Sequence, residues 1–357
     1  MTLSSTMPRT SFPSPEPQTA VGPPESRGVP RDGVRLLVAS PSAIQHARFR
    51  DIDRFLRPGD VLVVNTSGTV PAEVDGWSAR LGDLVLHVAT PRVPLEDGSV
   101  VVELRTPPDA ASPVLGGRPG DEVQLGAGVT IRLLEAYPRE GSSPTGAGNR
   151  LWRAAVPGPF SGLLRRRGRP IAYGYLNARY PLREYQTVFS KDPGSAEMPS
   201  AGRPFTNRLV TRLVRAGVVI APVLLHTGVS SQDAGEGPQP EPFAVTEATA
   251  SLVNASRATG GRIIAVGTTA TRALESATGA DGVVRPASGW TDLVLGPERP
   301  VRVVNGLITG WHNPEASHLL LVESVGGPDL TQRAYDAAVQ HGYAWHEFGD
   351  SCLFLPG

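Results

Sequence analysis

The stretch 260–276, GGRIIAVGTTATRALES, limits what this chain can fold into more than any other part of the sequence. Its apolar, β-branched run at 262–266 is typical of a buried parallel strand, and the run stops at Gly267. A helix is expected next, because the hydroxyl groups of Thr268 and Thr269 can cap a helix N-terminus. A strand, a glycine turn and a helix in this order predict an α/β fold.

The same turn is a candidate binding site. Its backbone N–H groups and the positive end of the helix suit a carboxylate or a phosphate, and Arg272 lies one turn further on as a second anchor. The alternative is a capped connection inside an α/β core that binds nothing, which is the commoner use of such a pattern. The local pattern leaves both explanations open.

The rest of the chain divides into segments that differ in composition and in their strand and helix patterns. Residues 1–29 are rich in Pro, Ser and Thr, and we expect them to form a disordered tail. Strand and helix patterns alternate at 30–74 and again at 157–357, whereas 75–156 holds short strand patterns separated by turns. We therefore predict an α/β core domain interrupted by a small antiparallel β-barrel domain, which a chain of 357 residues can accommodate.

Composition excludes several classes of protein. A net charge of zero gives no overall attraction to nucleic acid or membrane, and no apolar run approaches the ~20 residues of a membrane span. A single cysteine, Cys352, excludes a disulfide framework and a multi-cysteine metal site, and it fits a reducing cytoplasm. The histidine spacings do not fit a metal site. We expect a cytoplasmic monomer that needs no metal.

One segment, 165–215, is strongly basic. It holds ten arginines and Lys191 against three acidic residues, so its net charge is +8. Arginines can neutralise phosphates, and tyrosines in the same segment offer faces on which bases stack. The segment is therefore a candidate RNA contact, led by Arg165, Arg166, Arg167 and Arg169. A solvated charged surface explains the same pattern equally well.

Several polar residues follow predicted strands or begin predicted helices. Ligands bind at the carboxyl ends of the strands in open α/β sheets, so we expect these residues to converge on one pocket. A further strand is predicted at 301–304, and Pro314 is placed at the first position of a helix over 316–325. The residues expected at the pocket are His226, Thr268, Thr269, Thr291, Thr309, His312 and Glu315.

A series of motifs in fixed order covers about 31–355. It comprises Arg31-Asp32, LRPGD at 56–60, VPA at 70–72, YQTV at 185–188, Ala201-Gly202, Phe205-Thr206, Leu225-His226, GTT at 267–269, Arg272, LES at 274–276, GWTD at 289–292, NGL at 305–307, Thr309, His312, Pro314-Glu315 and Gly349-Asp350. The series resembles the S-adenosylmethionine:tRNA ribosyltransferase-isomerase family of queuosine biosynthesis, whose members combine an α/β core with an inserted β-barrel.

The resemblance implies a reaction and its substrates. The ribosyl part of S-adenosylmethionine would be transferred and isomerised onto 7-aminomethyl-7-deazaguanine in the anticodon loop of tRNA. The products would be epoxyqueuosine-tRNA, adenine and methionine. S-adenosylmethionine is then a co-substrate, and tRNA is the partner.

The required chemistry assigns hypothetical roles to residues of the matching motifs. A sulfonium acidifies the ribose C5′ protons, so one base near neutral pH can start the loss of adenine, with His226 the first candidate and His312 the second. Glu241 or Glu315 can hold the sulfonium or the methionine ammonium. Tyr185 and Gln186 are candidate RNA contacts. The candidate binding residues for S-adenosylmethionine are Gly202, Gly228, Gly267, Thr268, Thr269, Arg272, Thr291, Thr309, Pro314 and Glu315.

The sequence also departs from the family pattern at polar loop positions. Thr66 replaces an acidic residue, Gly68 and Glu73 replace arginines, and Arg203-Pro204 replaces Leu-His. The loop at 229–242 is shorter than usual, which bears on how a lid would close. The departures leave three functions open: the family reaction, a paralogue that uses another acceptor, or a catalytically silent RNA-binding protein. Release of adenine and methionine with precursor tRNA, turnover with another acceptor, or tRNA binding without turnover would distinguish them.

Overall fold

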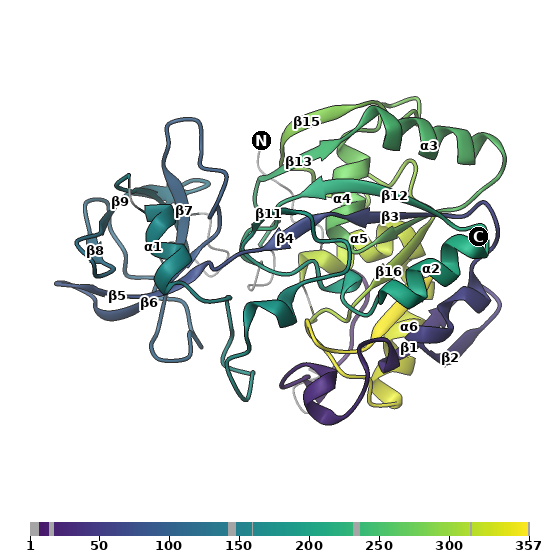
Figure 1. Ribbon diagram of the computed structural model, residues 1–357, viewed down its shortest axis with the longest axis horizontal. Helices are drawn as coiled ribbons and strands as arrows, with labels where there is room; N and C mark the ends of the chain where they lie inside the picture. Colours follow the sequence, from purple (N-terminus) through teal and green to yellow (C-terminus); the bar gives the residue numbers. More distant parts are fainter. Residues whose placement is uncertain are drawn as a thin grey trace.

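The computed structural model describes residues 7–13, 18–141, 148–158, 160–230, 236–314 and 316–355. Figure 1 shows a barrel of strands at one end of the molecule and a large sheet flanked by helices at the other. This arrangement confirms the predicted fold class, an α/β core with an inserted antiparallel β-barrel. The barrel strands lie between Glu73 and Ala155 in the chain. The domain boundaries themselves stay a prediction.

The core is built on a nine-stranded sheet in the order β15-β13-β12-β3-β14-β16-β17-β1-β2. Strands β12, β3, β14 and β16 run parallel at its centre, and β17 runs parallel to β1. The other neighbours pair antiparallel. The strands are β1 Arg35–Ala39, β2 Ile44–Arg48, β3 Val61–Asn65, β12 Val219–Leu225, β13 Glu241–Val245, β14 Ile263–Val266, β15 Ala287–Thr291, β16 Gly306–Thr309 and β17 Ser351–Phe354.

The two faces of the central strands pack into separate hydrophobic cores. Val61 and Val63 of β3 belong to one core, and Leu62 and Val64 belong to the other. Successive side chains of a strand point to opposite faces, so a strand covered on both sides must be apolar throughout. The first face is covered by α3 Glu247–Ala258, α4 Thr268–Ser276, α5 Ser317–Gly326 and α6 Pro328–Gln340, and the second by α2 Asn207–Arg215 and the 3-10 helix η4 Phe49–Phe55.

Six antiparallel strands close the barrel in the order β10-β7-β6-β5-β8-β9, with β9 pairing back to β10. They are β5 Glu73–Ser78, β6 Gly82–Val88, β7 Val100–Arg105, β8 Glu122–Gln124, β9 Thr130–Tyr137 and β10 Leu151–Ala155. Helix α1, Phe160–Arg167, adds Phe160, Leu163 and Leu164 to the barrel core. A short parallel pair, β4 Ser67–Thr69 and β11 Asp192–Ser195, lies between barrel and core.

A row of buried ionisable side chains crosses three barrel strands. His87 of β6 lies between its cross-strand neighbours, with Nε2 3.1 Å from Glu73 Oε2 and Nδ1 3.6 Å from Glu103 Oε2. Burial by itself lowers the pKa of His87, but Glu103 and Glu73 outweigh it, and the net pKa is raised. Burial opposes ionisation of the two carboxyl groups, yet His87 and nearby arginines lower the pKa of each to about 2.

Arginines from several segments complete this row and connect the barrel to the core. Arg150 contacts both Glu103 and Glu236, and Glu236 comes from the loop that precedes β13. A carboxylate of the core is therefore buried against a cation of the barrel. The remaining pairs are Arg169 and Arg179 with Glu73, and Arg105 with Glu103.

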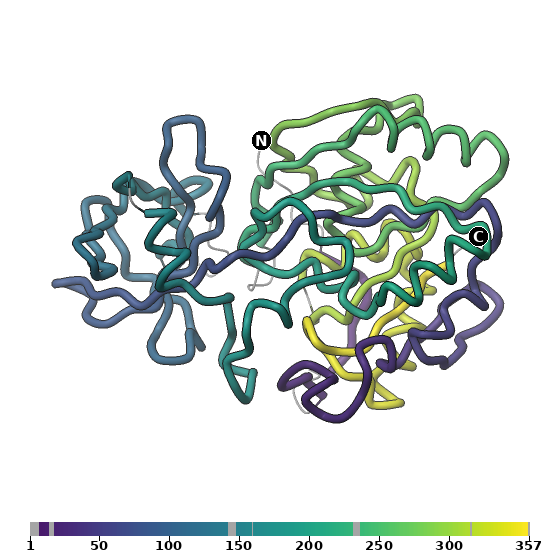
Figure 2. Tube along the Cα trace, viewed as in Figure 1, coloured from purple at the N-terminus to yellow at the C-terminus, as the bar shows by residue number. Residues whose placement is uncertain are grey.

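The N-terminal segment differs from the disordered tail that its composition predicts. Phe12 and Ala20 are buried, and Phe12 stacks on Trp345 with ring centroids 5.3 Å apart. The backbone N–H of Ala20 donates to the Trp345 carbonyl at 3.1 Å. Figure 2 shows this purple segment beside the yellow C-terminal part of the chain. Aromatic partners more than 300 residues away in the sequence, which composition does not reveal, anchor the segment.

Two local predictions on the C-terminal side of α4 are wrong. Residues 301–304 form no strand, and the strand near them is β16, Gly306–Thr309. Pro314 is not the first residue of a helix, because α5 begins at Ser317 with Ala316 as its N-cap. Apolar β-branched residues at 301–304 instead belong to or pack against the core beside β14 without joining the strand ladder.

The substitution Glu103→Gln tests the barrel row. It leaves the Arg105 and Arg150 guanidinium groups buried beside a neutral amide, so we expect the free energy of unfolding in urea at pH 7 to fall by about 3–5 kcal/mol. Glu135→Gln in β9 is the matched control, because Glu135 is exposed and pairs with Arg153 at the surface. The control should cost at most about 1 kcal/mol. Equal losses in the two variants would contradict a structural role for the row.

Candidate functional site

A cleft of about 900 Å³ opens at the carboxyl ends of the central strands. It is lined by the residues after β12, the start of α4, the connection from β16 to α5, and the segments around 173–175 and 346–347. Many residues predicted from the sequence meet here. They are Gly228, Glu241, Gly267, Thr268, Thr269, Arg272, Thr309, His312 and Pro314. Glu315, which was also predicted to bind here, lies outside the described residues.

The N-terminus of α4 faces the cleft without a side-chain cap. The N-cap is Gly267, with φ +92°, and not a threonine hydroxyl as the sequence predicts. The Thr269 hydroxyl instead accepts a hydrogen bond from Asn65 Nδ2 at 3.2 Å, and the same Nδ2 donates to the Leu225 carbonyl at 2.8 Å. Since no side chain occupies the helix end, the first N–H groups of α4 can bind an anion.

Arg272 and Glu241, each predicted to bind the ligand, bind each other. Arg272 donates from Nη1 to Glu241 Oε2, and its other nitrogens donate to the carbonyls of Leu293, Gln239 and Thr291 at 3.0–3.2 Å. Glu241 Oε1 accepts from the Gly228 N–H at 2.8 Å. Burial raises the pKa of Glu241, and Arg272 opposes that rise. These contacts fix the cleft wall and leave neither side chain free to serve as the main anchor of a ligand.

His312 lies in the cleft wall and is neutral at physiological pH. Its Nε2 is 3.0 Å from Thr309 Oγ1, and its ring stacks on His318 at 4.7 Å with an interplanar angle of 6°. Burial lowers the pKa of His312 well below its usual value, and the neighbouring His318 and His346 lower it further. Burial likewise lowers the pKa of His318 to about 4. A neutral imidazole in this position can accept a proton or a hydrogen bond.

His226 follows β12 as the sequence predicts, but it is not among the residues that line the cleft. Its Nδ1 is 2.7 Å from Ser67 Oγ, and Ser67 Oγ is 2.5 Å from Ser195 Oγ. Burial lowers the pKa of His226, while Asp192 raises it. The ring packs directly on Gly194, where a Cβ atom would lie 2.3 Å from it. His226 therefore connects β4 and β11 to the end of β12.

Gly202 and Thr291, two other predicted binding residues, also lie outside the cleft lining. Gly202 ends the 3-10 helix Ser200–Gly202, where its Cα faces Thr187. The Thr291 hydroxyl is 2.5 Å from Ser276 Oγ and accepts from the Leu293 N–H.

A second wall of the cleft consists of aromatic and acidic side chains that no sequence motif indicates as a group. Tyr173 stacks on Tyr175 at 6.1 Å, and Tyr175 stacks on His346 at 4.6 Å. Glu197 accepts a hydrogen bond from the Tyr173 hydroxyl, and Glu347 accepts one from the Tyr175 hydroxyl. The sequence offers the tyrosines as stacking surfaces for bases. It gives no signal for Glu347, because its neighbours come from residues about 150–170 positions earlier.

The predicted RNA-contacting residues have different surroundings. Arg165, Arg166 and Arg167 of α1 are exposed, and no ion pair joins them to a described acidic residue. Arg169, in contrast, pairs with Glu73 and Asp75. Tyr185 is only 3% exposed, which is at odds with stacking on a base, and both polar atoms of the Gln186 side chain bond to the backbone of Thr69.

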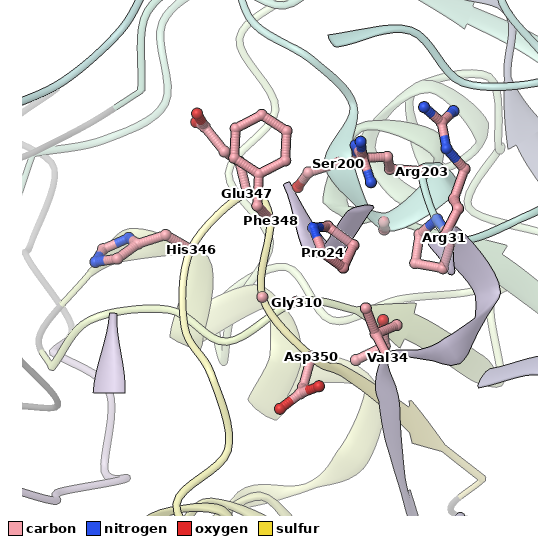
Figure 3. A pocket seen from close by; sticks show the side chains of 14 residues that line it. Pro24, Arg31, Val34, Ser200, Arg203, Gly310, His346, Glu347, Phe348 and Asp350 are labelled. Carbon is pink, nitrogen blue, oxygen red and sulfur yellow. The ribbon is translucent and has the colours of Figure 1, made fainter. Parts of the chain in front are cut away.

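Five residues that depart from the family pattern do not line the cleft, whereas the shortened loop at 229–242 contributes Val229, Ser230, Pro238 and Gln239 to its lining. The five are Thr66, Gly68, Glu73, Arg203 and Pro204. Arg203 pairs with Glu25 and Glu184, and Pro204 lines a separate cavity of about 10 Å³, seen in Figure 3. The Thr66 hydroxyl donates to the Val223 carbonyl at 3.2 Å. Each changed polar group has acquired partners of its own inside the protein.

Neither a metal site nor a membrane-spanning helix is present in the part of the chain that the structure describes. Its residues contain no group of three or more His, Cys, Asp or Glu side chains placed to hold a metal ion. Each described helix is too short or too polar to cross a membrane.

Comparisons with known proteins cover nearly the whole chain. A family model described as "Queuosine biosynthesis protein" matches residues 9–354. The S-adenosylmethionine:tRNA ribosyltransferase-isomerase of Moorella thermoacetica is 36% identical over 91% of this chain and 94% of its own length. That of Symbiobacterium thermophilum is 34% identical over the same shares. The crystal structure of S-adenosylmethionine tRNA ribosyltransferase from Thermotoga maritima matches with a TM-score of 0.52 and 26% identity, covering 97% of this chain and 99% of that chain.

The pairing of Arg272 with Glu241 can be tested by a double-mutant cycle. Arg272→Met leaves a buried carboxyl group without its cation, so we expect it to lower the free energy of unfolding by about 3–5 kcal/mol. The double variant Arg272→Met/Glu241→Met removes both charges and should recover part of that loss, as measured by urea unfolding. Additive losses would show that the two residues do not stabilise each other.

Proposed function

This chain belongs to the family of queuosine biosynthesis proteins, and on that premise we propose that its cleft carries out the S-adenosylmethionine:tRNA ribosyltransferase-isomerase reaction. The enzyme transfers and isomerises the ribosyl part of S-adenosylmethionine onto 7-aminomethyl-7-deazaguanine in tRNA, giving epoxyqueuosine-tRNA, adenine and methionine. The observation that carries the proposal is the family match over residues 9–354 together with a cleft lined by the family's motif residues.

The five changed side chains favour this reaction over a paralogue with another acceptor. A change of substrate is expected to alter side chains that touch the substrate, yet these five residues lie outside the cleft lining; the shortened loop at 229–242 is the departure that does line it. Their new partners, such as Arg169 and Arg179 for Glu73, are internal to the protein. The altered charges of Glu73 and Arg203 are thus neutralised by ion pairs within the protein.

We assign the N-terminus of α4 to the methionine carboxylate. Thr268 and Thr269 line the cleft there, the helix end lacks a side-chain cap, and its dipole favours negative charge. The carboxylate would sit at the carboxyl end of β14, where ligands of open α/β sheets bind. Arg272 supports this site indirectly, since it holds the adjoining backbone through the carbonyls of Gln239, Thr291 and Leu293.

Among the histidines, we assign the base to His312. A sulfonium makes the C5′ protons of the ribose acidic, and a neutral imidazole that lines the cleft can take one of them. Thr309 Oγ1 at 3.0 Å from Nε2 orients the ring. His226 is the weaker candidate, because it does not line the cleft and its Nδ1 is engaged by Ser67.

For the tRNA we assign the exposed arginines of α1. Arg165, Arg166 and Arg167 have no acidic partner among the described residues, so their charge is available to phosphates. Contact with the anticodon loop, a monomeric state and a cytoplasmic location complete the proposal.

The substitution His312→Asn tests both the reaction and the base. With S-adenosylmethionine and tRNA that carries 7-aminomethyl-7-deazaguanine, the wild-type protein should release adenine and methionine, and the variant should be slower by about 10²–10⁴-fold. A base must be deprotonated, and the pKa of His312 is lowered, so wild-type kcat/KM should hold as pH falls through 6.5 and decline only below it. Absence of wild-type turnover would overturn the function, whereas a fully active variant would overturn only the base.

The triple variant Arg165→Ala/Arg166→Ala/Arg167→Ala tests the binding of tRNA by α1. We expect a higher KM for tRNA and an unchanged KM for S-adenosylmethionine. The slope of log affinity against log salt should fall by about one for each phosphate that the helix no longer neutralises. Arg54→Ala/Arg57→Ala removes exposed charge elsewhere and is the control. The assignment fails if both variants bind tRNA as the wild type does.

A further inference from the structure

The Glu347 carboxyl group lies between two cavities and lacks a full set of hydrogen-bond partners. It lines both the 900 Å³ cleft and the small cavity of Figure 3. Its Oε2 accepts a hydrogen bond from the Tyr175 hydroxyl at 3.2 Å, while its buried Oε1 has no hydrogen-bond partner among the described residues. An unsatisfied buried carboxyl oxygen is costly to the fold, which points to a bound group that satisfies it.

The charged neighbours of Glu347 are already engaged elsewhere. Arg203 pairs with Glu25 and Glu184, and its guanidinium lies over the Phe348 ring at 5.0 Å. Figure 3 shows the Glu347 carboxyl group on one side of that ring and the Arg203 guanidinium on the other. The protein therefore supplies no salt-bridge partner to Glu347 within the part that the structure describes.

The second acidic group of this wall is held differently. Glu197 accepts hydrogen bonds from the Tyr173 hydroxyl, the Ser230 hydroxyl and the Ser230 N–H. Three donors within the protein already serve this carboxyl group. Glu347 is therefore the acidic side chain of this wall whose Oε1 still lacks a hydrogen-bond partner among the described residues.

An aromatic stack adjoins this carboxyl group through the Tyr175 hydroxyl. Tyr175 lies between Tyr173 and His346 in a stack with interplanar angles of 26° and 14°, and all three line the cleft. The stack covers both faces of Tyr175 with rings, and the Tyr175 hydroxyl points to Glu347, so the carboxyl group is the part of this wall that attracts an organic cation. The opposite charge preference holds at the N-terminus of α4, which suits an anion. The lining of the cleft thus includes one group that suits a negative charge and one that suits a positive charge.

We propose that Glu347, which lies beside the stack of Tyr175 and His346, binds the organic cation of a substrate in this cleft. This inference rests on the proposed function, which brings two such cations: the sulfonium of S-adenosylmethionine and the alkylammonium of the aminomethyl base in tRNA. Both are positive groups on alkyl carbon, and both would be held by charge rather than by shape alone. Glu347 is then a binding residue for the reaction.

The proposal predicts a pH dependence of binding. Burial and the charge of Glu197 raise the pKa of Glu347 to about 8, and Tyr175 and Arg203 oppose the rise; Tyr185 also faces the group, and His346 adjoins it. The free protein therefore holds a proton on Glu347 at pH 7, and a cation must displace it. Affinity for the cation should rise as pH increases from 6 to about 8 and level off above that.

Calorimetry on the full-length wild type and the nearly isosteric Glu347→Gln variant tests this inference without requiring turnover. The ligands are S-adenosylmethionine, tRNA that carries 7-aminomethyl-7-deazaguanine, and the same tRNA with guanine at that position. We expect the variant to lose roughly ten- to a hundredfold in affinity for one of the two cationic ligands, as for a hydrogen bond to a charged group. It should also lose the rise in affinity between pH 6 and 8. Glu247→Gln, at an exposed position of α3, is the control.

Each outcome decides a separate point. Weaker binding of S-adenosylmethionine assigns the site to the sulfonium, and weaker binding of the aminomethyl tRNA, with no change for the guanine tRNA, assigns it to the alkylammonium. Equal affinities of wild type and variant for both ligands overturn the inference. So does a wild-type affinity that is flat between pH 6 and 9, which needs no variant at all. A wild type that binds with the expected pH dependence but releases no adenine would overturn the proposed reaction and leave the cation site standing.

Discussion

The turn at Gly267 is the constraint on which the cleft depends. A φ angle of +92° is open to glycine and strained for other residues, and a Cβ atom here would lie 3.2 Å from that of Ala201. The turn ends β14 and directs α4 so that its uncapped N-terminus meets the cleft. Asn65 then ties the end of β3 to β12 and to Thr269 of the same helix. Three strand ends and one helix end are thereby held together around the proposed site for a negative group.

The sequence was informative where structure is local and repetitive. Four consecutive apolar residues in β14 predict a strand that is buried on both faces. The neighbouring strand β3 is apolar in the same way, and its alternate residues pack into two separate cores. Polar residues after strands predict a shared pocket because parallel strands end at one edge, and Thr269, Thr309 and His312 do meet there. The sequence was uninformative about which polar groups satisfy each other. From the sequence alone Arg272 is expected to bind an anion. In the structure it binds Glu241, which lies 31 positions earlier in the chain.

The arginines of the basic segment show the same limit, because the sequence does not reveal which acidic residues they pair with. A count of charges finds +8 at 165–215, but several of those arginines neutralise acids from outside the segment, as Arg169 and Arg179 do for Glu73. What is left for solvent and for an RNA phosphate includes the three arginines of α1, together with Lys191, Arg208 and Arg215, which are also exposed. Glu347 illustrates the reverse case: a residue with no motif acquires its chemistry from burial, from Glu197 and from an aromatic stack assembled from two distant segments.

The position of β17 has a consequence for how the protein is made. This strand comes from residues 351–354, yet it lies inside the sheet between β16 and β1, with β1 and β2 at the edge beyond it. During synthesis on the ribosome the hairpin of β1 and β2 emerges before β17, and β1 cannot pair with this neighbour until residues 351–354 have left the ribosome. The two halves of the sheet join only then, and until that moment both expose open backbone edges that a nascent chain must keep from foreign strands.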